Sequence, residues 1–177
     1  ISIEWSDTVD VYDIQVEDTH CLVANGMIAH NCGEIFMQEY DACRLMCLNL
    51  FSFVENPFTT DAKVNFDLLY KIAYEQQRLA DDLVDLELEH IERIIAKIKS
   101  DPEPVEIKQS ELDLWNKIYD VCKSGRRTGC GFTALGDILA ALNLPYDSDK
   151  GLEVIEKVMQ TKMEGELDCT IDLAILR

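Results

Sequence analysis

Residues 11–32, VYDIQVEDTHCLVANGMIAHNC, divide the chain into a strand-like opening and a longer remainder of different character. Polar and apolar residues alternate at 11–16, and a second apolar run, CLVA at 21–24, leads to Asn25-Gly26. A period of two predicts β-strands, and Asn-Gly is typical of the tight turn between two strands. We therefore expect strands at 11–16, 21–24 and 27–29, in a β unit too short to fold alone.

From about residue 64 the sequence becomes helical, as VDLELEHIERIIAKI (84–98) shows. Its apolar residues recur at spacings of four and three and form one stripe, made of Val84, Leu88, Ile91, Ile95 and Ile98. This helix should end near Ser100, because Pro102 and Pro104 follow. Capping and stop signals predict three more helices, at 110–123, 133–143 and 148–163.

Composition narrows the classes of function. The 177 residues are 47% hydrophobic and carry 34 acidic against 16 basic side chains, a net charge of -18. Such a surface repels phosphate backbones and anionic lipid, so we expect neither a nucleic-acid partner nor a membrane. No apolar run reaches the ~18 residues that cross a bilayer, and no secretory leader opens the chain. These features predict a cytoplasmic protein.

The seven cysteines contain no Cys-x-x-Cys pair, which argues against a structural zinc site and predicts no metal. They lie at positions 21, 32, 43, 47, 122, 130 and 169. The chain starts with Ile1 in place of methionine and stops inside the apolar run DCTIDLAILR. We therefore expect it to be a piece of a longer protein.

The stretch 11–32 resembles the C-terminal end of an intein, a protein-splicing element. Five residues match the intein pattern at the required spacing: Asp13, His20, His30, Asn31 and Cys32. Each of these residues alone is more often structural, but together they coincide with the change in composition at residue 31. The resemblance implies a short all-β piece of the Hint type over residues 1–31.

The splicing chemistry explains each residue type. Cys32 would accept the acyl group on its thiol, and Asn31 would then break the following peptide bond by closing a succinimide on its own carbonyl. His30 would polarise that carbonyl or protonate the leaving amine. His20 and Asp13 would tune proton transfer. These steps need no cofactor.

Residues 32–177 resemble a second family, the ribonucleotide reductase large chain, and most closely its adenosylcobalamin-dependent class. The resemblance lies in CGEIFMQEYDACRLMCLNL (32–50), QRLADDLVDLE (77–87) and GRRTGCGFTALGD (125–137). It implies that 32–177 form a mainly α-helical part of a ten-stranded α/β-barrel domain. The expected fold class is therefore mixed, with an intein segment at 1–31 and a reductase barrel fragment at 32–177.

Three roles follow from this second resemblance. Cys32 matches the cysteine that carries the thiyl radical, and Glu34 matches the base that deprotonates the ribose 3'-hydroxyl. Cys43, eleven residues after Cys32, matches one member of the cysteine pair that reduces the substrate. We expect Cys47 and Phe132 to be core residues.

Some charged residues near these motifs also carry predictions. We expect Arg126 and Arg127 to form structural ion pairs. Glu87 and His90 have the Glu-x-x-His spacing of di-iron bundles, but only one copy exists where two are required. We expect Glu87 and Glu89 to lie on a solvated helix face, with His90 beside them.

The implied reaction makes deoxyribonucleotides for DNA replication from a ribonucleotide substrate, with adenosylcobalamin as cofactor and a thiol as reductant. The further partners would be the N-terminal intein and reductase portions, and the complete enzyme could be a homodimer. Two alternatives stay open. The chain could be the C-terminal half of a split intein acting in trans. It could also be a helical interaction protein without catalysis, which would account for 64–177 but not for 11–43.

Overall fold

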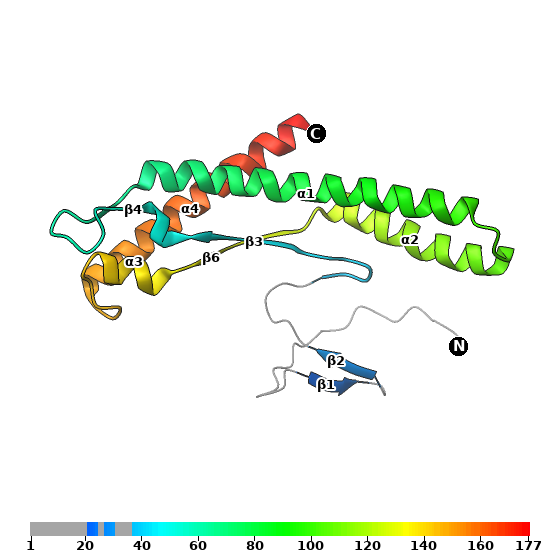
Figure 1. The fold of residues 1–177 in the computed structure, drawn as a ribbon, viewed down its shortest axis with the longest axis horizontal. Helices are drawn as coiled ribbons and strands as arrows, with labels where there is room; N and C mark the ends of the chain where they lie inside the picture. The colour runs from blue at the N-terminus through cyan, green and yellow to red at the C-terminus, as the bar shows by residue number, and fades with distance from the viewer. Residues whose placement is uncertain (1–20, 25–26, 31–36) are drawn as a thin grey trace, which may run out of the picture. The chain divides into compact units, whose positions relative to one another are not determined.

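The computed structural model describes residues 21–24, 27–30 and 37–177, which belong to two compact units, Ile1–Glu39 and Tyr40–Arg177 (Figure 1). In the first unit β1 (Cys21–Ala24) and β2 (Met27–His30) pair antiparallel, with Cys21 opposite His30 and Ala24 opposite Met27. The strands predicted at 21–24 and 27–29 are confirmed. The strand predicted at 11–16 lies outside the described residues.

The second unit is built on two parallel strands, β3 (Arg44–Asn49) and β6 (Thr128–Thr133). Two parallel strands need a long connection between them. The connection from β3 to β6 contains the helices α1 (Phe66–Ser100) and α2 (Val105–Gly125). Neither strand was predicted from the sequence, because TGCGFT (128–133) does not alternate and is rich in glycine. A short 3-10 helix, η1 (Leu50–Phe53), and a small antiparallel pair, β4 (Val54–Glu55) with β5 (Lys63–Val64), complete the strand-containing part.

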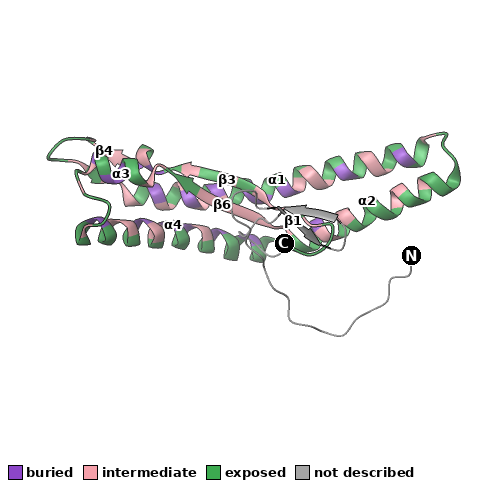
Figure 2. Cartoon of the chain, turned by 90° about the horizontal axis from the view of Figure 1, so that it is seen from below, coloured by how far each residue is buried: buried purple, intermediate pink, exposed green. Residues whose placement is uncertain are grey.

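Helix α1 is 35 residues long and packs against a different partner along each half (Figures 1 and 2). The Asn65 side chain caps its start by accepting a hydrogen bond from the Leu68 amide at 2.9 Å. Its C-terminal half packs on α2, where Val84, Ile91 and Cys122 are buried together. The predicted apolar stripe and the end at Ser100 are both confirmed.

The N-terminal half of α1 packs on α4 (Asp149–Leu176) and on a second core beside α3 (Leu135–Ala141). This core contains Leu50, Phe53, Leu69, Ile138, Leu139 and Val158. The two long helices approach closely at Gly165, where a Cβ would lie 2.5 Å from the Tyr70 carbonyl oxygen. The tyrosine hydroxyls of α1 donate across this contact, Tyr70 to Asp168 at 2.6 Å and Tyr74 to Asp172 at 2.8 Å.

Helix boundaries differ from the predictions where tertiary packing extends a helix. The start of α4 near Ser148 is confirmed, and the Ser148 side chain caps the helix. The helix continues to Leu176 and not to 163, because residues beyond Gly165 pack on α1. Helix α2 begins at Val105 and not at 110, and α3 is shorter than predicted. The described chain is mainly helical with few strands, and none of its helices combines the length and hydropathy needed to cross a bilayer.

The burial of Ile91 leads to a stability prediction. Ile91 is 2% exposed between α1 and α2, whereas Leu86 on the same helix is 58% exposed. Ile91→Ala should lower the free energy of unfolding by about 2–5 kcal/mol, because it leaves a cavity in a packed core. The control Leu86→Ala should change it by less than about 0.5 kcal/mol. Urea denaturation followed by circular dichroism measures both, and equal effects would contradict the helix pairing.

Candidate functional site

Cys43 directly precedes β3 and is held between two ion pairs. On one side the buried Asp41 carboxylate pairs with Arg127, and on the other Arg44 donates from its Nε to Glu87 at 2.5 Å. The Arg44 amide also donates to the Arg127 carbonyl at 3.3 Å, which extends the β3–β6 ladder. The backbone that carries the Cys43 side chain is therefore fixed on both sides.

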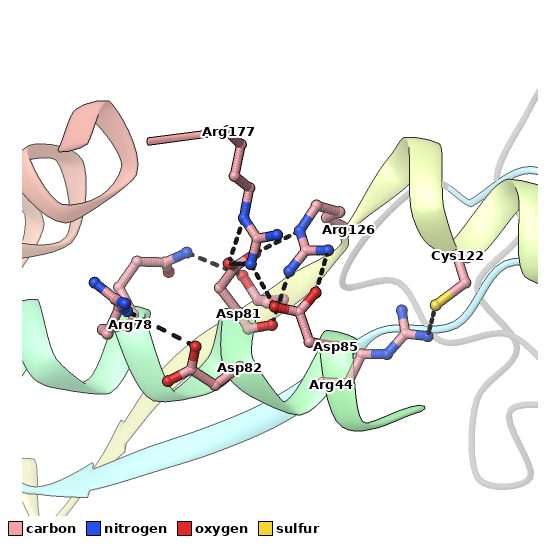
Figure 3. Close-up of polar contacts among 10 residues, drawn as sticks. Arg44, Arg78, Asp81, Asp82, Asp85, Cys122, Arg126 and Arg177 are labelled. Carbon is pink, nitrogen blue, oxygen red and sulfur yellow. Dashed lines mark hydrogen bonds and ion pairs between the residues drawn. The ribbon is translucent and has the colours of Figure 1, made fainter. Parts of the chain in front are cut away.

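The Arg44–Glu87 pair corrects one prediction. Glu87 is held in an ion pair with Arg44, whose side chain is 9% exposed, and the Glu87 side chain itself is only partly exposed, at 35%. His90, by contrast, is exposed as expected. Arg44 also donates to the Cys122 sulfur at 2.9 Å (Figure 3), and burial raises the pKa of the Cys122 thiol. The thiol is protonated at neutral pH, which disfavours it as a nucleophile.

One face of the β3–β6 pair carries thiols opposite glycines. Leu45 and Cys47 lie opposite Gly129 and Gly131 in the strand register, and the Cys43 sulfur lies beside Gly129. Cys47 is exposed, so the prediction that it is a core residue is wrong, and Phe132 is also exposed, at 39%. Both predictions rested on residue type alone. Strand alternation places the Cys47 side chain on the face away from the helices.

The other face of the pair packs on α1 and α4. The Gln76 amide donates to the Met46 carbonyl at 2.7 Å, and the buried Lys162 ammonium donates to the Cys130 carbonyl at 2.6 Å. The Cys130 thiol contacts the Gln77 side-chain oxygen at 3.2 Å. Burial raises the pKa of this thiol to about 11. Cys130 therefore has a structural environment, whereas Cys43 faces the side of the sheet that the helices leave open.

A network of two arginines and two aspartates joins α1, the end of α2 and the end of α4 (Figure 3). Arg126 contacts Asp81 at 2.6 Å and Asp85 at 2.8 Å, and Arg177 contacts both carboxylates at 2.6 Å. Arg126 has a left-handed backbone, with φ of 42°, which is uncommon for a residue other than glycine. The predicted structural ion pairs of Arg126 and Arg127 are confirmed.

The network sets the protonation of its members. Burial of Asp81 opposes ionisation, but hydrogen bonds from Arg126 and Arg177 outweigh it and lower the pKa of Asp81. The hydrogen bond from Arg177 is the main reason that the pKa of Asp85 is lowered. Both carboxylates are ionised at neutral pH. The network is therefore a fixed set of charges and offers no proton donor.

The three segments that carry the reductase resemblance meet at this strand pair. Segment 32–50 supplies β3 and Cys43, segment 77–87 supplies Glu87 and the two aspartates, and segment 125–137 supplies β6 with Arg126 and Arg127. Sequence reasoning missed the Arg44–Glu87 pair. The only signal for this pair was the presence of opposite charges in segments far apart in the chain.

Of the predicted site residues, Cys43 alone has a described side chain. His30 is the last residue of β2, and only its backbone is described. Asp13, His20, Asn31, Cys32 and Glu34 lie outside the described residues. No prediction about their geometry is tested.

The described residues form no cluster of metal ligands and contain three surface hollows. Within residues 37–177 and the two strands of the first unit, no group of three His, Cys, Asp or Glu side chains could hold a metal ion. Three surface hollows in this part measure 200, 320 and 410 Å³, a range that suits a compact ligand.

Comparison with known proteins identifies the family. The family model described as "Ribonucleotide reductase, barrel domain" matches residues 17–176. The chain belongs to this family. The matched range contains β3, β6 and the helices α1 to α4, and it begins before Cys32.

Individual relatives of this reductase barrel chain are named vitamin B12-dependent ribonucleoside-diphosphate reductases. One from Mycobacterium tuberculosis is 25% identical over 129 residues, which is 73% of this chain and 14% of the relative. One from Thermoplasma acidophilum is 29% identical over 128 residues, 72% of this chain and 13% of the relative. The chain thus spans about a seventh of the length of these curated relatives. No solved structure matches it significantly.

The Asp81 network leads to a second stability prediction. The Asp81 side chain is 8% exposed and binds two arginines, whereas the neighbouring Asp82 is 53% exposed and pairs only with Arg78. Asp81→Asn should lower the free energy of unfolding by about 3 kcal/mol, because the guanidinium groups of Arg126 and Arg177 each lose one of their two carboxylate partners. Asp82→Asn should change it by less than about 1 kcal/mol.

The pH dependence of this effect checks its cause. Because the folded pKa of Asp81 lies below its ordinary value, its contribution is present at neutral pH and is lost as the pH falls through the folded pKa. The stability difference between Asp81→Asn and the unchanged chain should be constant from pH 7 to 5 and should shrink in more acidic solution. A difference that persists undiminished at pH 2 would show that packing, and not charge, causes it.

Proposed function

We propose that residues 32–177 are part of the catalytic barrel of a ribonucleotide reductase that works by thiyl-radical chemistry. The observation that carries this proposal is the meeting of the three family segments at the strand beside Cys43. Family membership and the relatives' names support the reaction class. The whole barrel, proposed to have ten strands, would be completed by parts of the enzyme outside this chain.

The proposed reaction uses three residues of this chain. Cys32 as a thiyl radical takes the ribose 3'-hydrogen and later returns it, and Glu34 removes the proton of the 3'-hydroxyl. The 2'-hydroxyl leaves as water, and a hydrogen replaces it. Cys43 and a partner cysteine outside this chain supply the two electrons and two protons and become a disulfide, which a thiol reductant then reduces.

The cofactor belongs to the complete enzyme. The relatives' names mention vitamin B12, so we propose adenosylcobalamin as the radical source. We assign none of the three hollows to it and propose that other parts of the enzyme hold it. The ribonucleotide substrate, the thiol reductant and a homodimeric assembly are likewise proposed for the whole protein, in the cytoplasm.

We also propose that residues 1–31 are the C-terminal segment of an intein and that splicing joins Cys32 to an upstream reductase part. The antiparallel pair β1–β2 ends at His30, one residue before Asn31 completes the proposed intein segment, which supports this boundary. In the proposed sequence Cys32 accepts the acyl group and Asn31 cyclises. His30 assists at the junction carbonyl, while His20 and Asp13 tune proton transfer.

Two alternatives to cis splicing have to be distinguished. The upstream intein half could be a separate chain, in which case splicing occurs in trans. Alternatively, residues 17–31 could belong to the barrel itself, because the family match begins at residue 17. The other interpretation left open by the sequence, a helical interaction protein without catalysis, is disfavoured by family membership.

Asn31→Ala should block cleavage after residue 31, because no other residue at the junction can form the succinimide. The chain is supplied with a complementary N-terminal intein half, and mass spectrometry of the products is the measurement. Asn25→Ala provides a matched control outside the junction and should cleave normally. Normal cleavage in Asn31→Ala would end the intein proposal, and no cleavage in the unchanged chain would favour a barrel role for 17–31.

Three substitutions separate splicing from reduction in a reconstituted full-length precursor supplied with adenosylcobalamin, nucleotide and reductant. Cys32→Ser should retain slow splicing, because a hydroxyl can accept an acyl group, but it should abolish reduction, because an O–H bond is too strong for the radical carrier. Glu34→Gln and Cys43→Ser should splice normally and lose turnover. Reductase turnover by the spliced Cys32→Ser product would overturn the assignment of Cys32.

A further inference from the structure

Gly129 has no side chain, and the Cys43 thiol lies next to the space that a side chain at this position would fill. A Cβ built on Gly129 would lie 3.2 Å from the Cys43 sulfur and 2.5 Å from Cδ2 of Leu45. The next glycine on this face of β6 repeats the relation, because a Cβ at Gly131 would lie 3.0 Å from the Cys47 sulfur. At both glycines of β6 an added Cβ would therefore lie closer to a thiol than ordinary van der Waals contact.

We propose that Gly129 is a positioning residue that fixes where the Cys43 thiol lies on the open face of the β3–β6 pair. This inference rests on the proposed function, in which Cys43 is the reducing thiol. Any larger side chain at 129 would displace the sulfur from the face on which the substrate and the partner cysteine have to meet it.

If a side chain is added at position 129, the surrounding contacts hold the backbone in place, so the Cys43 thiol has to move. The Cys43 backbone is held by the Asp41–Arg127 ion pair before it and by Arg44 after it, which donates to the Ala42 carbonyl at 2.6 Å. The strand register pairs Arg44 with Thr128, next to Gly129. Because both backbones are fixed, a new Cβ at 129 acts on the sulfur and not on the separation of the strands.

The same geometry predicts that the fold survives the substitution. The 2.5 Å contact involves the end of the Leu45 side chain, which is 61% exposed and can rotate into solvent. Gly129 does not have a left-handed backbone, so an L-residue is allowed there. Alanine also loses less conformational entropy than glycine in a strand. The 3.2 Å contact then remains, and it is shorter than an ordinary contact by a few tenths of an ångström.

Catalysis is sensitive to displacements of this size. A misplacement of about 1 Å costs about 100-fold in rate, so a shift of a few tenths should cost roughly threefold to tenfold. Cys47 is not a substitute for Cys43, because four residues along a strand span about 13 Å, and the two thiols cannot reach the same reacting atom. The effect of position 129 should therefore be specific to Cys43.

Thiol reactivity in the full chain tests the proposal without requiring turnover. Iodoacetamide alkylation of Cys43 and Cys47 is followed by peptide mass spectrometry in Gly129→Ala, Gly131→Ala and Gly136→Ala. Gly129→Ala should slow Cys43 at least threefold and leave Cys47 unchanged, and Gly131→Ala should do the reverse. Gly136→Ala should change neither rate, because a Cβ there meets nothing within 4 Å.

The Leu45→Ala background separates a contact with the thiol from a contact with the leucine. Without the leucine side chain the 2.5 Å contact is gone, so the variant folds even if Gly129→Ala alone does not. Gly129→Ala/Leu45→Ala should still alkylate Cys43 at least threefold more slowly than Leu45→Ala. Equal rates in these two folded chains would overturn the proposal.

Turnover in the reconstituted enzyme distinguishes failure of this inference from failure of the proposed function. Gly129→Ala should lower kcat about threefold to tenfold with KM unchanged, and an unchanged kcat would overturn the catalytic importance of position 129. If Cys43→Ser still turns over, the proposed role of Cys43 is wrong, whereas the alkylation result still reports whether Gly129 positions the thiol.

Discussion

β3 and β6 pair in parallel, so the chain between them has to return from one end of the pair to the other, and α1 and α2 make that crossing. The pairing sets where each helix packs. The first half of α1 and α4 cover one face of the pair, and the second half of α1 extends beyond it to pack on α2. The face that the helices do not cover carries Cys43.

Ion pairs hold the ends of this arrangement. The chain has few basic residues for its 34 acidic ones, and every one of its six arginines lies in the described part and contacts a carboxylate. The buried pairs join segments far apart in the sequence, whereas the exposed ones join neighbours on α1. Buried pairs stabilise only when both partners are present, which makes the junction of α1, α2 and α4 sensitive to single substitutions.

Two proposed chemistries share Cys32. Splicing needs a thiol or hydroxyl after the intein, and a reductase needs a thiol that can carry a radical, so only cysteine satisfies both. In the unspliced precursor the residue is still joined to Asn31, and we expect that form to be inactive as a reductase. Cys43 takes part only in reduction, and its surroundings in β3 and β6 are formed entirely by residues after the junction.

The sequence by itself determined the local features: the strands at 21–24 and 27–29, the apolar stripe and end of α1, and the start of α4 near residue 148. These depend on periodicity and capping within a few residues. Motif resemblance also identified the reductase family and selected Cys43. Only the tertiary structure decided the parallel pairing of β3 with β6, the full length of α4 and the opposition of Gly129 to the Cys43 thiol. These three features depend on contacts between segments that are distant in the chain, and no local pattern encodes such contacts. The glycine-rich strand β6 and the second half of α4 are stabilised by packing and not by intrinsic propensity.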